Sequence, residues 1–471
     1  MRNYQNTYRY SLEWITQNQA KLIRGLIIIS VLLLSILISL RSTRLPLQLI
    51  LTLIIGIGAL IIFLKWPPIG LMLIMVVGMF VPMVGPGGFN GSILLIALLL
   101  GLWILDMVVR QRNIQLVPSR TMLPIFIFIG ICILALGMGQ FSWYPFASQA
   151  PMDAQLGGFV IYILSAGAFL LVANQVRDLR WLKAIVWIFL ILGGVYVVAR
   201  FIPGVGGIVT SLYQRGVHSN SMFWIWLVAL SFSQAVFNHR LRISLRAGLL
   251  GVTLISLYVG FVQAGTWRSG WIPPLITIAA ILYFRYARIL FVLIPFAGIY
   301  GWILANQSIA AESYSWLTRI EAWKIVLSIS KINLILGTGF ANYYWYTPLF
   351  PILGWYVKFN SHSQYVDLIA QVGLLGLGCF LWFFWEIGRL SMSLRASVPE
   401  GFTKAYVYGV IGGIAGTLVA AALVDWVLPF VYNIGMTGFR GSVFAWIFLG
   451  GLVSIEQIVR GQANTNAELL L

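Results

Sequence analysis

Four basic residues in this chain have side chains suited to the chemistry of a negatively charged phosphate: Arg215, Arg268, Arg319 and His362. The planar guanidinium group of arginine binds two phosphate oxygens at once and stays charged at physiological pH. A neutral imidazole ring can take a proton from a hydroxyl group. Together these side chains predict a site that binds a diphosphate and contains a general base.

The surroundings of His362 indicate how its ring is kept neutral. Ser361 and Gln364 have the spacing of a capping box, so we expect a helix to begin at His362. The positive end of the helix dipole disfavours the imidazolium form, and a neutral ring is what a general base requires. A histidine that only hydrogen-bonds a loop beside a helix start remains an alternative. His218 is a second candidate, and its role stays open.

Acidic residues are scarce around these basic groups. The predicted outer loops contain no Asp-x-Asp pair and no acidic cluster, so we expect no metal ion and no cofactor, with guanidinium groups carrying the charge of a leaving diphosphate. Asp367 and Asp425 lie toward the same side of the spans as the arginines, and either is expected to orient one of them.

Three other acids precede arginines by three or four positions, which is the spacing of ordinary ion pairs on a helix. The three pairs are Asp106 with Arg110, Glu386 with Arg389, and Glu456 with Arg460. We expect these pairs at the cytoplasmic ends of spans.

The composition of the 471-residue chain is that of a membrane protein. Hydrophobic residues make up 60% of it, charged residues only 9%, and the mean hydropathy is +0.93. The long, continuous apolar stretches favour helices over the alternating pattern of a β-barrel. The net charge of +18 fits basic loops beside anionic lipid headgroups and, without a basic domain outside the spans, does not indicate nucleic acid. Cys132 and Cys379 lie within expected spans and are interpreted as core residues.

The apolar stretches predict an all-α, polytopic helical membrane protein with about 14 transmembrane helices. The expected spans are residues 24–40, 45–64, 67–84, 92–110, 121–139, 157–174, 181–200, 220–237, 244–262, 271–285, 288–304, 363–388, 406–430 and 441–459. A partly helical outer loop domain is expected between spans 11 and 12. The chain is accordingly divided into N-terminal helices 1–200, central helices 201–304, the loop domain 305–361 and C-terminal helices 362–471.

The distribution of basic residues sets the expected orientation. With the N-terminus in the cytoplasm, two thirds of the 30 Lys and Arg residues fall on the cytoplasmic side, in agreement with the positive-inside rule. The C-terminus is then also cytoplasmic, and the four basic residues face the periplasmic or extracellular side of the plasma (inner) membrane. Basic residues are sparse on that side, so we expect them to bind an anion. For any single arginine, an anchor that snorkels to lipid headgroups is the alternative.

The loop domain contains one expected helix and one aromatic cluster. The helical pattern covers residues 315–332, and Gly337-Thr338-Gly339 breaks it. The residues expected to share one face of this helix are Trp316, Ile320, Trp323 and Leu327. The aromatic cluster that follows is Tyr343, Tyr344, Trp345 and Tyr346. Either an interfacial aromatic belt or a wall that stacks on sugars or lipids accounts for this cluster.

Several of these segments, taken in order, resemble the O-antigen ligase and O-antigen polymerase superfamily. The segments are Arg215-Gly216 through Asn220, Arg268-Ser269-Gly270, Arg319-Ile320-Glu321-Ala322-Trp323, residues 335–343 around Gly337-Thr338-Gly339, Ser361-His362-Ser363-Gln364-Tyr365, and residues 371–377 around Gly373 and Gly376. The resemblance covers about residues 200–390. Two positions depart from the family pattern: Trp267 precedes Arg268 where the family has serine, and Ser363 follows His362 where asparagine is usual.

The resemblance implies a metal-independent membrane glycosyltransferase of the all-helical type. Its donor would be an undecaprenyl-diphosphate-linked glycan on the periplasmic or extracellular face, and its acceptor a glycan, lipid or protein hydroxyl. By that similarity Arg215, Arg268 and Arg319 would bind the diphosphate, and His362 would deprotonate the acceptor in an inverting displacement. Asn220 and Trp323 lie within the matching motifs and would support the site.

Two other functions remain open from the sequence. A transporter or flippase for an anionic or lipid-linked substrate would also place arginines in outer loops. A non-catalytic membrane scaffold would leave all four basic residues replaceable. The resemblance does not separate a ligase from a polymerase, because the two differ mainly in their acceptor.

Overall fold

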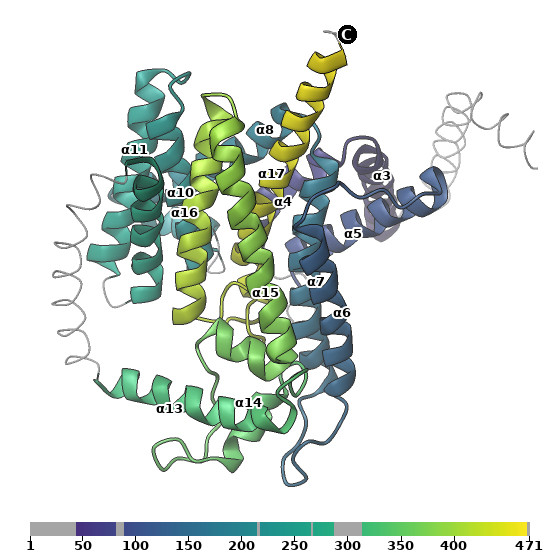
Figure 1. Cartoon of the computed structure of the whole chain (residues 1–471), viewed down its shortest axis with the longest axis vertical. Helices are drawn as coiled ribbons and strands as arrows, with labels where there is room; N and C mark the ends of the chain where they lie inside the picture. Colours follow the sequence, from purple (N-terminus) through teal and green to yellow (C-terminus); the bar gives the residue numbers. More distant parts are fainter. Residues whose placement is uncertain (1–43, 82–88, 214–216, 265–266, 287–312, 469–471) are drawn as a thin grey trace, which may run out of the picture. The chain divides into compact units, whose positions relative to one another are not determined.

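The computed structural model describes the chain except for residues 1–43, 82–88, 214–216, 265–266, 287–312 and 469–471 (Figure 1). All regular elements within the described residues are helices, apart from one isolated bridge between Ile352 and Trp355. The expected spans 24–40 and 288–304, and Arg215, lie outside the described residues. The chain divides into two compact units, Met1–Lys65 and Trp66–Leu471, and helix α3 (Arg44–Lys65) belongs to the first.

The second unit holds the remaining helices. They are α4 (Pro67–Phe80), α5 (Gly91–Leu105), α6 (Met122–Met138), α7 (Met152–Gln175), α8 (Leu179–Ala199), α9 (Gly206–Leu212), α10 (Ser221–Phe237), α11 (Ile243–Tyr258), a helix over residues 268–286, α13 (Ser313–Ser330), α14 (Asn342–Tyr346), α15 (Gln364–Ser397), α16 (Phe402–Leu423) and α17 (Gly435–Glu468). Helices α5 and α11 continue as π-helical turns over Asp106–Gln111 and Val259–Gln263. Helix α17 packs on α7, and α10 packs between α11 and α16.

Seven helices in the described part of the chain are long and apolar enough to cross a membrane. They are Gly91–Gln111, Met152–Gln175, Leu179–Ala199, Ile243–Gln263, Gln364–Ser397, Phe402–Leu423 and Gly435–Gly461. Four shorter apolar helices are Leu53–Lys65, Pro67–Phe80, Met122–Met138 and Ser221–Phe237. The predicted class, a helical membrane protein, is therefore confirmed, whereas the predicted number of about 14 spans is not.

The prediction of a helix over residues 406–430 is wrong at its C-terminal end. Helix α16 ends at Leu423, and residues 424–434 form a loop. The start of α15 holds this loop, because the Gln364 N–H donates to the Val424 carbonyl at 3.3 Å and the Gln364 Oε1 accepts from the Leu428 N–H at 2.8 Å. Apolar composition alone did not reveal this turn.

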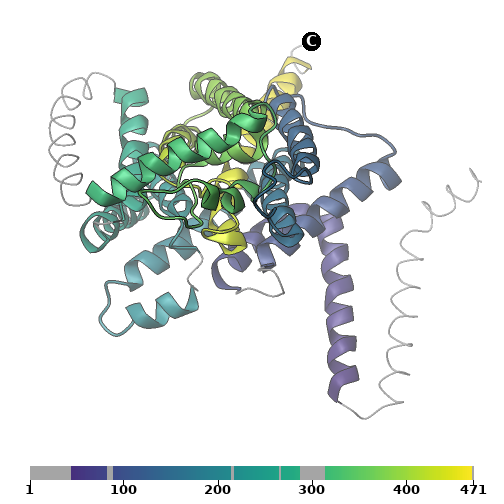
Figure 2. The same cartoon turned by 90° about the horizontal axis from the view of Figure 1, so that it is seen from below.

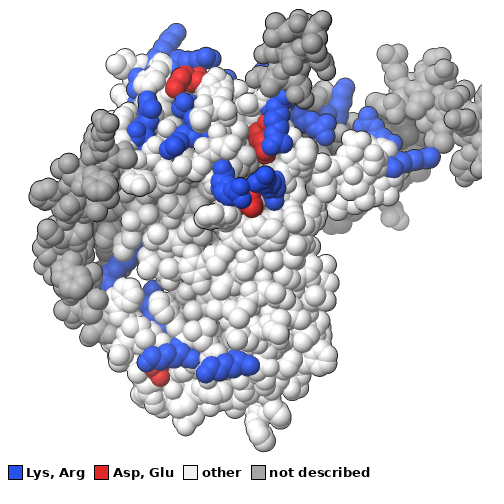
Figure 3. All heavy atoms as spheres, viewed as in Figure 1, with Lys and Arg blue, Asp and Glu red and all other residues white. Residues whose placement is uncertain are grey.

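The charged side chains of the second unit gather at its two ends. Figure 3 shows Lys and Arg side chains concentrated toward the end that carries the C-terminal part of α17, and a smaller group beside α13, with largely uncharged surface between them. Helices α13 and α14 lie across the ends of α15 and α16, away from the C-terminal end of α17 (Figures 1 and 2). An uncharged belt between two charged ends is the surface expected of a membrane-embedded protein.

The loop domain docks on α15 at Gly373, through the residues just before Gly337-Thr338-Gly339. Gly373 interrupts this helix with φ 71° and ψ −175°, and the freed N–H groups of Leu374 and Leu375 donate to the carbonyls of Leu334 and Ile335 at 2.9 and 3.2 Å. A side chain at Gly373 would collide with the Ile335 backbone. Only glycine combines a positive φ with such a close backbone approach.

We expect Gly373→Ala to lower the stability of the folded protein by at least about 2 kcal/mol, because alanine is strained at this φ and its Cβ displaces the Ile335 backbone. Gly378→Ala on the same helix is the matched control, since no atom lies within 4 Å of the added Cβ. Thermal unfolding of the detergent-solubilised protein measures both variants. Equal melting temperatures for the two would contradict the docking described above.

Candidate functional site

The loop domain covers the ends of the spans through a buried apolar cluster. Helix α13 contributes Ile325, Val326 and Ile329 to this cluster, and α15 contributes Val366 and Ala370. The face of α13 that carries Ile320, Trp323 and Leu327 is not the most buried one: Ile320 is exposed, while Trp323 and Leu327 lie at the edge of the apolar cluster.

His362 does not begin a helix, so the predicted capping box is wrong. Helix α15 begins at Gln364, and His362 lies in the preceding loop with φ 51°. The Ser361 hydroxyl accepts from the Ser363 N–H at 3.0 Å and donates to Asp367 at 2.7 Å, while the Gln364 side chain binds the loop 424–434. A positive φ is uncommon for residues other than glycine, and such residues cluster at functional sites.

A buried hydrogen-bond network holds the loop that carries His362. The Tyr343 hydroxyl donates to Asp367 Oδ1 at 2.5 Å, and the same carboxylate oxygen accepts from Ser361. The Trp323 indole N–H donates to the Ser361 carbonyl at 2.8 Å. Burial raises the pKa of Tyr343 well above its ordinary value, so this hydroxyl keeps the proton that it donates. Asp367 and Trp323 thus support His362 by fixing Ser361, the residue before it.

Arg319, His362 and Asp425 lie together at this end of the molecule. Arg319 Nη1 donates to the Leu423 carbonyl at 3.0 Å, beside the start of the loop that contains Asp425. The amide nitrogen of Asn360 donates to Asp425 Oδ2 at 3.1 Å and lies 3.5 Å from His362 Nδ1. Asn360 therefore joins the imidazole of His362 to the carboxylate of Asp425, and the Arg319 guanidinium lies at the start of the same loop as Asp425.

The electrostatics of this cluster keep His362 neutral. Burial, followed by the positive charge of Arg319, lowers the pKa of His362 from 6.5 to about 4. The neutral ring agrees with the prediction, but its cause is burial and a neighbouring guanidinium rather than a helix dipole. Burial raises the pKa of Asp425 to about 6, against hydrogen bonds from Asn433 and Asn360 and the charge of Arg319. Near pH 7 the site therefore holds a neutral base beside a permanent cation.

The contacts of the residues on either side of Arg268 place it at the same end of the molecule. It lies in the first turn of the helix over residues 268–286. The Trp267 and Trp426 rings have centroids 5.6 Å apart, which brings this turn beside the residue that follows Asp425. The Ser221 hydroxyl donates to the Ser269 carbonyl at 2.5 Å, which also ties the turn to the start of α10.

Asn220 and His218 have structural contacts of their own. Asn220 caps α10, accepting from the Met222 N–H at 2.8 Å, and its amide donates to the Gly438 carbonyl of α17 at 2.9 Å. The His218 ring stacks on Tyr196 with centroids 5.0 Å apart. These contacts hold α10 against its neighbours. Asn220 is linked to the Arg268 turn through the next residue, Ser221, and its own hydrogen bonds go to α10 and α17 rather than to His362 or Asp425.

Two residues of this cluster, Asn360 and Asn433, were not expected from the sequence. Asn433 donates to Asp425 Oδ1 at 2.6 Å, opposite the bond from Asn360. The signal for Asn360 was its position two residues before His362, where an amide can bridge to another loop. Asn433 had no comparable signal, because its role depends on the loop 424–434, of which residues 424–430 were expected to be helical.

The fold and this cluster define the protein as an all-helical membrane protein with a polar, partly buried site at the loop-domain end of its spans. The chain matches no protein-family model, and no curated protein matches it.

We expect the NMR signals of the His362 ring to remain those of neutral imidazole from pH 8 down to about pH 5, because its pKa lies at about 4. The unfolded chain protonates this ring below an ordinary pKa of 6.5, so the folded state loses stability as the pH falls from 6.5 toward 4. Titration of histidine-labelled protein measures the midpoint, with His362→Gln assigning the signal. A midpoint near 6.5 would show that the ring is neither buried nor close to Arg319.

Proposed function

We propose that the protein transfers a glycan from an undecaprenyl-diphosphate-linked donor to an acceptor hydroxyl on the outer face of the cytoplasmic membrane. The reaction is inverting and independent of metal ions, as in an O-antigen ligase or polymerase. The observation that carries the proposal is a neutral His362 beside the Asn360 amide that binds Asp425, with the Arg319 guanidinium close enough to lower the pKa of the ring. The motif order that resembles this superfamily supplies the donor and acceptor classes.

The proposed reaction balances with the groups of this cluster. The acceptor oxygen forms a bond to the anomeric carbon from the face opposite the leaving group, and the bond from that carbon to the diphosphate oxygen breaks. The bonding electron pair leaves with undecaprenyl diphosphate, and the acceptor proton passes to His362. Arg268 and Arg319 offset the charge that develops on the diphosphate.

Donor binding would also prepare the base. The charge of Arg319 is one cause of the low pKa of His362. A bound diphosphate offsets that charge, which raises the affinity of His362 for a proton. The pKa of His362 would then rise, and His362 would become a stronger base, only when the donor is bound. An ionised Asp425, joined to His362 through Asn360, would stabilise the imidazolium that forms.

The location of the cluster supports an outer-face reaction. It lies beside α13, away from the C-terminal end of α17, where the larger group of Lys and Arg side chains gathers (Figures 1 and 3). Under the positive-inside rule the more basic end faces the cytoplasm. Lipid-linked glycans that have been flipped outward would meet the cluster from the membrane.

The test uses membranes of the native host from which the gene has been deleted, since these supply both donor and acceptor. We expect the lipid-linked glycan to accumulate there. Adding the purified protein in the presence of EDTA should consume it and release undecaprenyl diphosphate, with inverted linkage in the product by mass spectrometry and NMR. Transfer that needs a divalent ion, or no accumulation of lipid-linked glycan, would overturn the proposal. Substrate flux across proteoliposomes without a glycan product would favour a transporter instead.

A further inference from the structure

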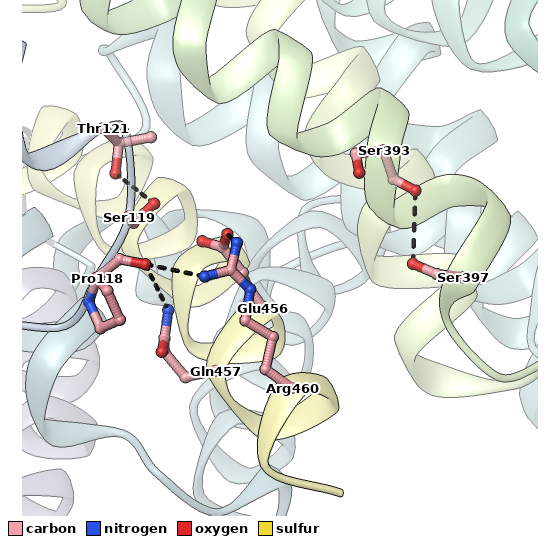
Figure 4. Close-up of polar contacts among 8 residues, drawn as sticks. All are labelled: Pro118, Ser119, Thr121, Ser393, Ser397, Glu456, Gln457 and Arg460. Atoms are coloured by element: carbon pink, nitrogen blue, oxygen red, sulfur yellow. Dashed lines mark hydrogen bonds and ion pairs between the residues drawn. The ribbon is translucent and has the colours of Figure 1, made fainter. Parts of the chain in front are cut away.

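A charged pocket of about 300 Å³ lies at the opposite end of the spans from His362. Its walls come from the residues before α6, the C-terminal half of α15 and the C-terminal half of α17. Figure 4 shows Ser119 and Thr121 on one side, Glu456 and Arg460 on α17, and Ser393 on α15 across from them. The proposed glycan transfer uses none of these groups.

The pocket combines groups that bind anions with groups that bind cations. Its lining includes the guanidinium groups of Arg120, Arg389 and Arg460 and the carboxylates of Glu386 and Glu456. Two of these cations are paired: Arg460 lies 2.5 Å from Glu456, and Arg389 lies 3.8 Å from Glu386. Arg120 is exposed and in no ion pair within the described residues. A ligand phosphate can therefore bind Arg120 and the loosely paired Arg389.

Glu456 is the group in this pocket that can bind a positively charged donor. It is only 5% exposed, and its Oε2 has no hydrogen bond of good geometry within the described part of the chain, although the Ser119 hydroxyl lies beside this carboxylate. Its Oε1 pairs with Arg460, which is also held by the Pro118 carbonyl at 3.1 Å (Figure 4). A charged donor such as an ammonium group binds a buried carboxylate oxygen more strongly than a neutral hydroxyl does. The pocket thus offers a site for a positive donor next to a site for a phosphate.

We propose that this pocket binds the headgroup of a phospholipid that carries a primary ammonium group, with the phosphate on Arg120 and Arg389 and the ammonium at Glu456. The same phosphate and ammonium occur in water-soluble phosphoethanolamine. A lipid is favoured because exposed apolar side chains lie close in sequence to lining residues: Leu123 on α6 is two positions after Thr121, and Trp385 on α15 directly precedes Glu386. Acyl chains can lie along these surfaces while the headgroup occupies the charged end.

Native mass spectrometry of the full chain, offered equal amounts of phosphatidylethanolamine and phosphatidylcholine with identical acyl chains, tests this assignment. Choline keeps the phosphate and the positive charge but has no N–H donor. We expect the wild-type protein to retain one phosphatidylethanolamine in about tenfold preference, the effect of a hydrogen bond to a charged group. Glu456→Gln should abolish the preference, and Arg389→Gln should lower retention of both lipids.

Arg180→Gln is the matched control. Arg180 is exposed, pairs with Asp178 at 2.7 Å and does not line the pocket. Arg180→Gln removes one positive charge, as Arg389→Gln does, and should leave both the amount of retained lipid and the preference for phosphatidylethanolamine unchanged. If Glu456→Gln does not elute as a folded species, two other measurements replace it. Arg389→Gln then tests whether the pocket binds the lipid phosphate, and the preference of the wild-type protein for phosphatidylethanolamine tests whether it binds the ammonium group.

Three results would overturn the proposal. The first is equal retention of the two lipids by the wild-type protein. The second is that Arg389→Gln retains the same amounts of both lipids as the wild-type protein. The third is an adduct with free phosphoethanolamine and no retained lipid, which would assign the pocket to a soluble ligand instead.

Discussion

His362→Ala is expected to lower glycan transfer by roughly 10²–10⁴-fold, the contribution typical of a positioned general base. The reason is that His362 is the neutral base of the cluster, with a pKa of about 4, held beside Arg319. The measurement is release of undecaprenyl diphosphate from the lipid-linked donor by the purified variant. Donor binding should change little, because the arginines remain.

The same position tests whether that loss is structural. His362 has a φ of 51°, which asparagine tolerates better than alanine. His362→Asn should therefore keep the loop and the melting temperature of the wild-type protein while remaining as inactive as His362→Ala. Wild-type turnover in either folded variant would remove His362 from the mechanism.

Arg319→Gln is expected to lower transfer by roughly 10²–10³-fold, because a guanidinium that meets the developing charge contributes like an oxyanion-hole donor. A second consequence separates this role from packing. Loss of the neighbouring charge should raise the pKa of His362 from about 4 toward its ordinary value, although burial keeps it below that value. Turnover and the histidine NMR titration measure the two effects on one variant.

Lys324→Gln is the matched control for Arg319→Gln. Lys324 lies on the same helix, is exposed and pairs with Glu321 at 3.4 Å. Lys324→Gln removes one positive charge outside the polar cluster of Arg319, His362 and Asp425. Turnover and the His362 titration should therefore match those of the wild-type protein. A loss in Lys324→Gln as large as that in Arg319→Gln would point to net charge on α13 rather than to a specific contact.

Composition was sufficient to predict the class of fold, since long apolar stretches in a chain with 9% charged residues leave few alternatives to membrane helices. The expected ion pairs Asp106–Arg110, Glu386–Arg389 and Glu456–Arg460 are confirmed at 3.3, 3.8 and 2.5 Å, because i,i+3 and i,i+4 spacing is a local property. Cys132 and Cys379 are confirmed as buried, free thiols.

The errors fell where long-range contacts override local pattern. Ser361 and Gln364 have the spacing of a capping box, yet each side chain bonds a different partner, Asp367 and Leu428 respectively. The break at Gly373 depends on carbonyls from the loop domain, and no pattern within α15 reveals it. Likewise, Asn360 and Asn433 meet at Asp425 only because the loop 424–434 folds back onto the start of α15.

The most direct measurement is an experimental structure of the protein with undecaprenyl diphosphate bound. We expect density for the diphosphate within hydrogen-bonding distance of the Arg319 and Arg268 guanidinium groups, with the His362 ring facing the terminal phosphate. Diphosphate bound elsewhere, or a cluster that stays empty at saturating lipid, would contradict this expectation.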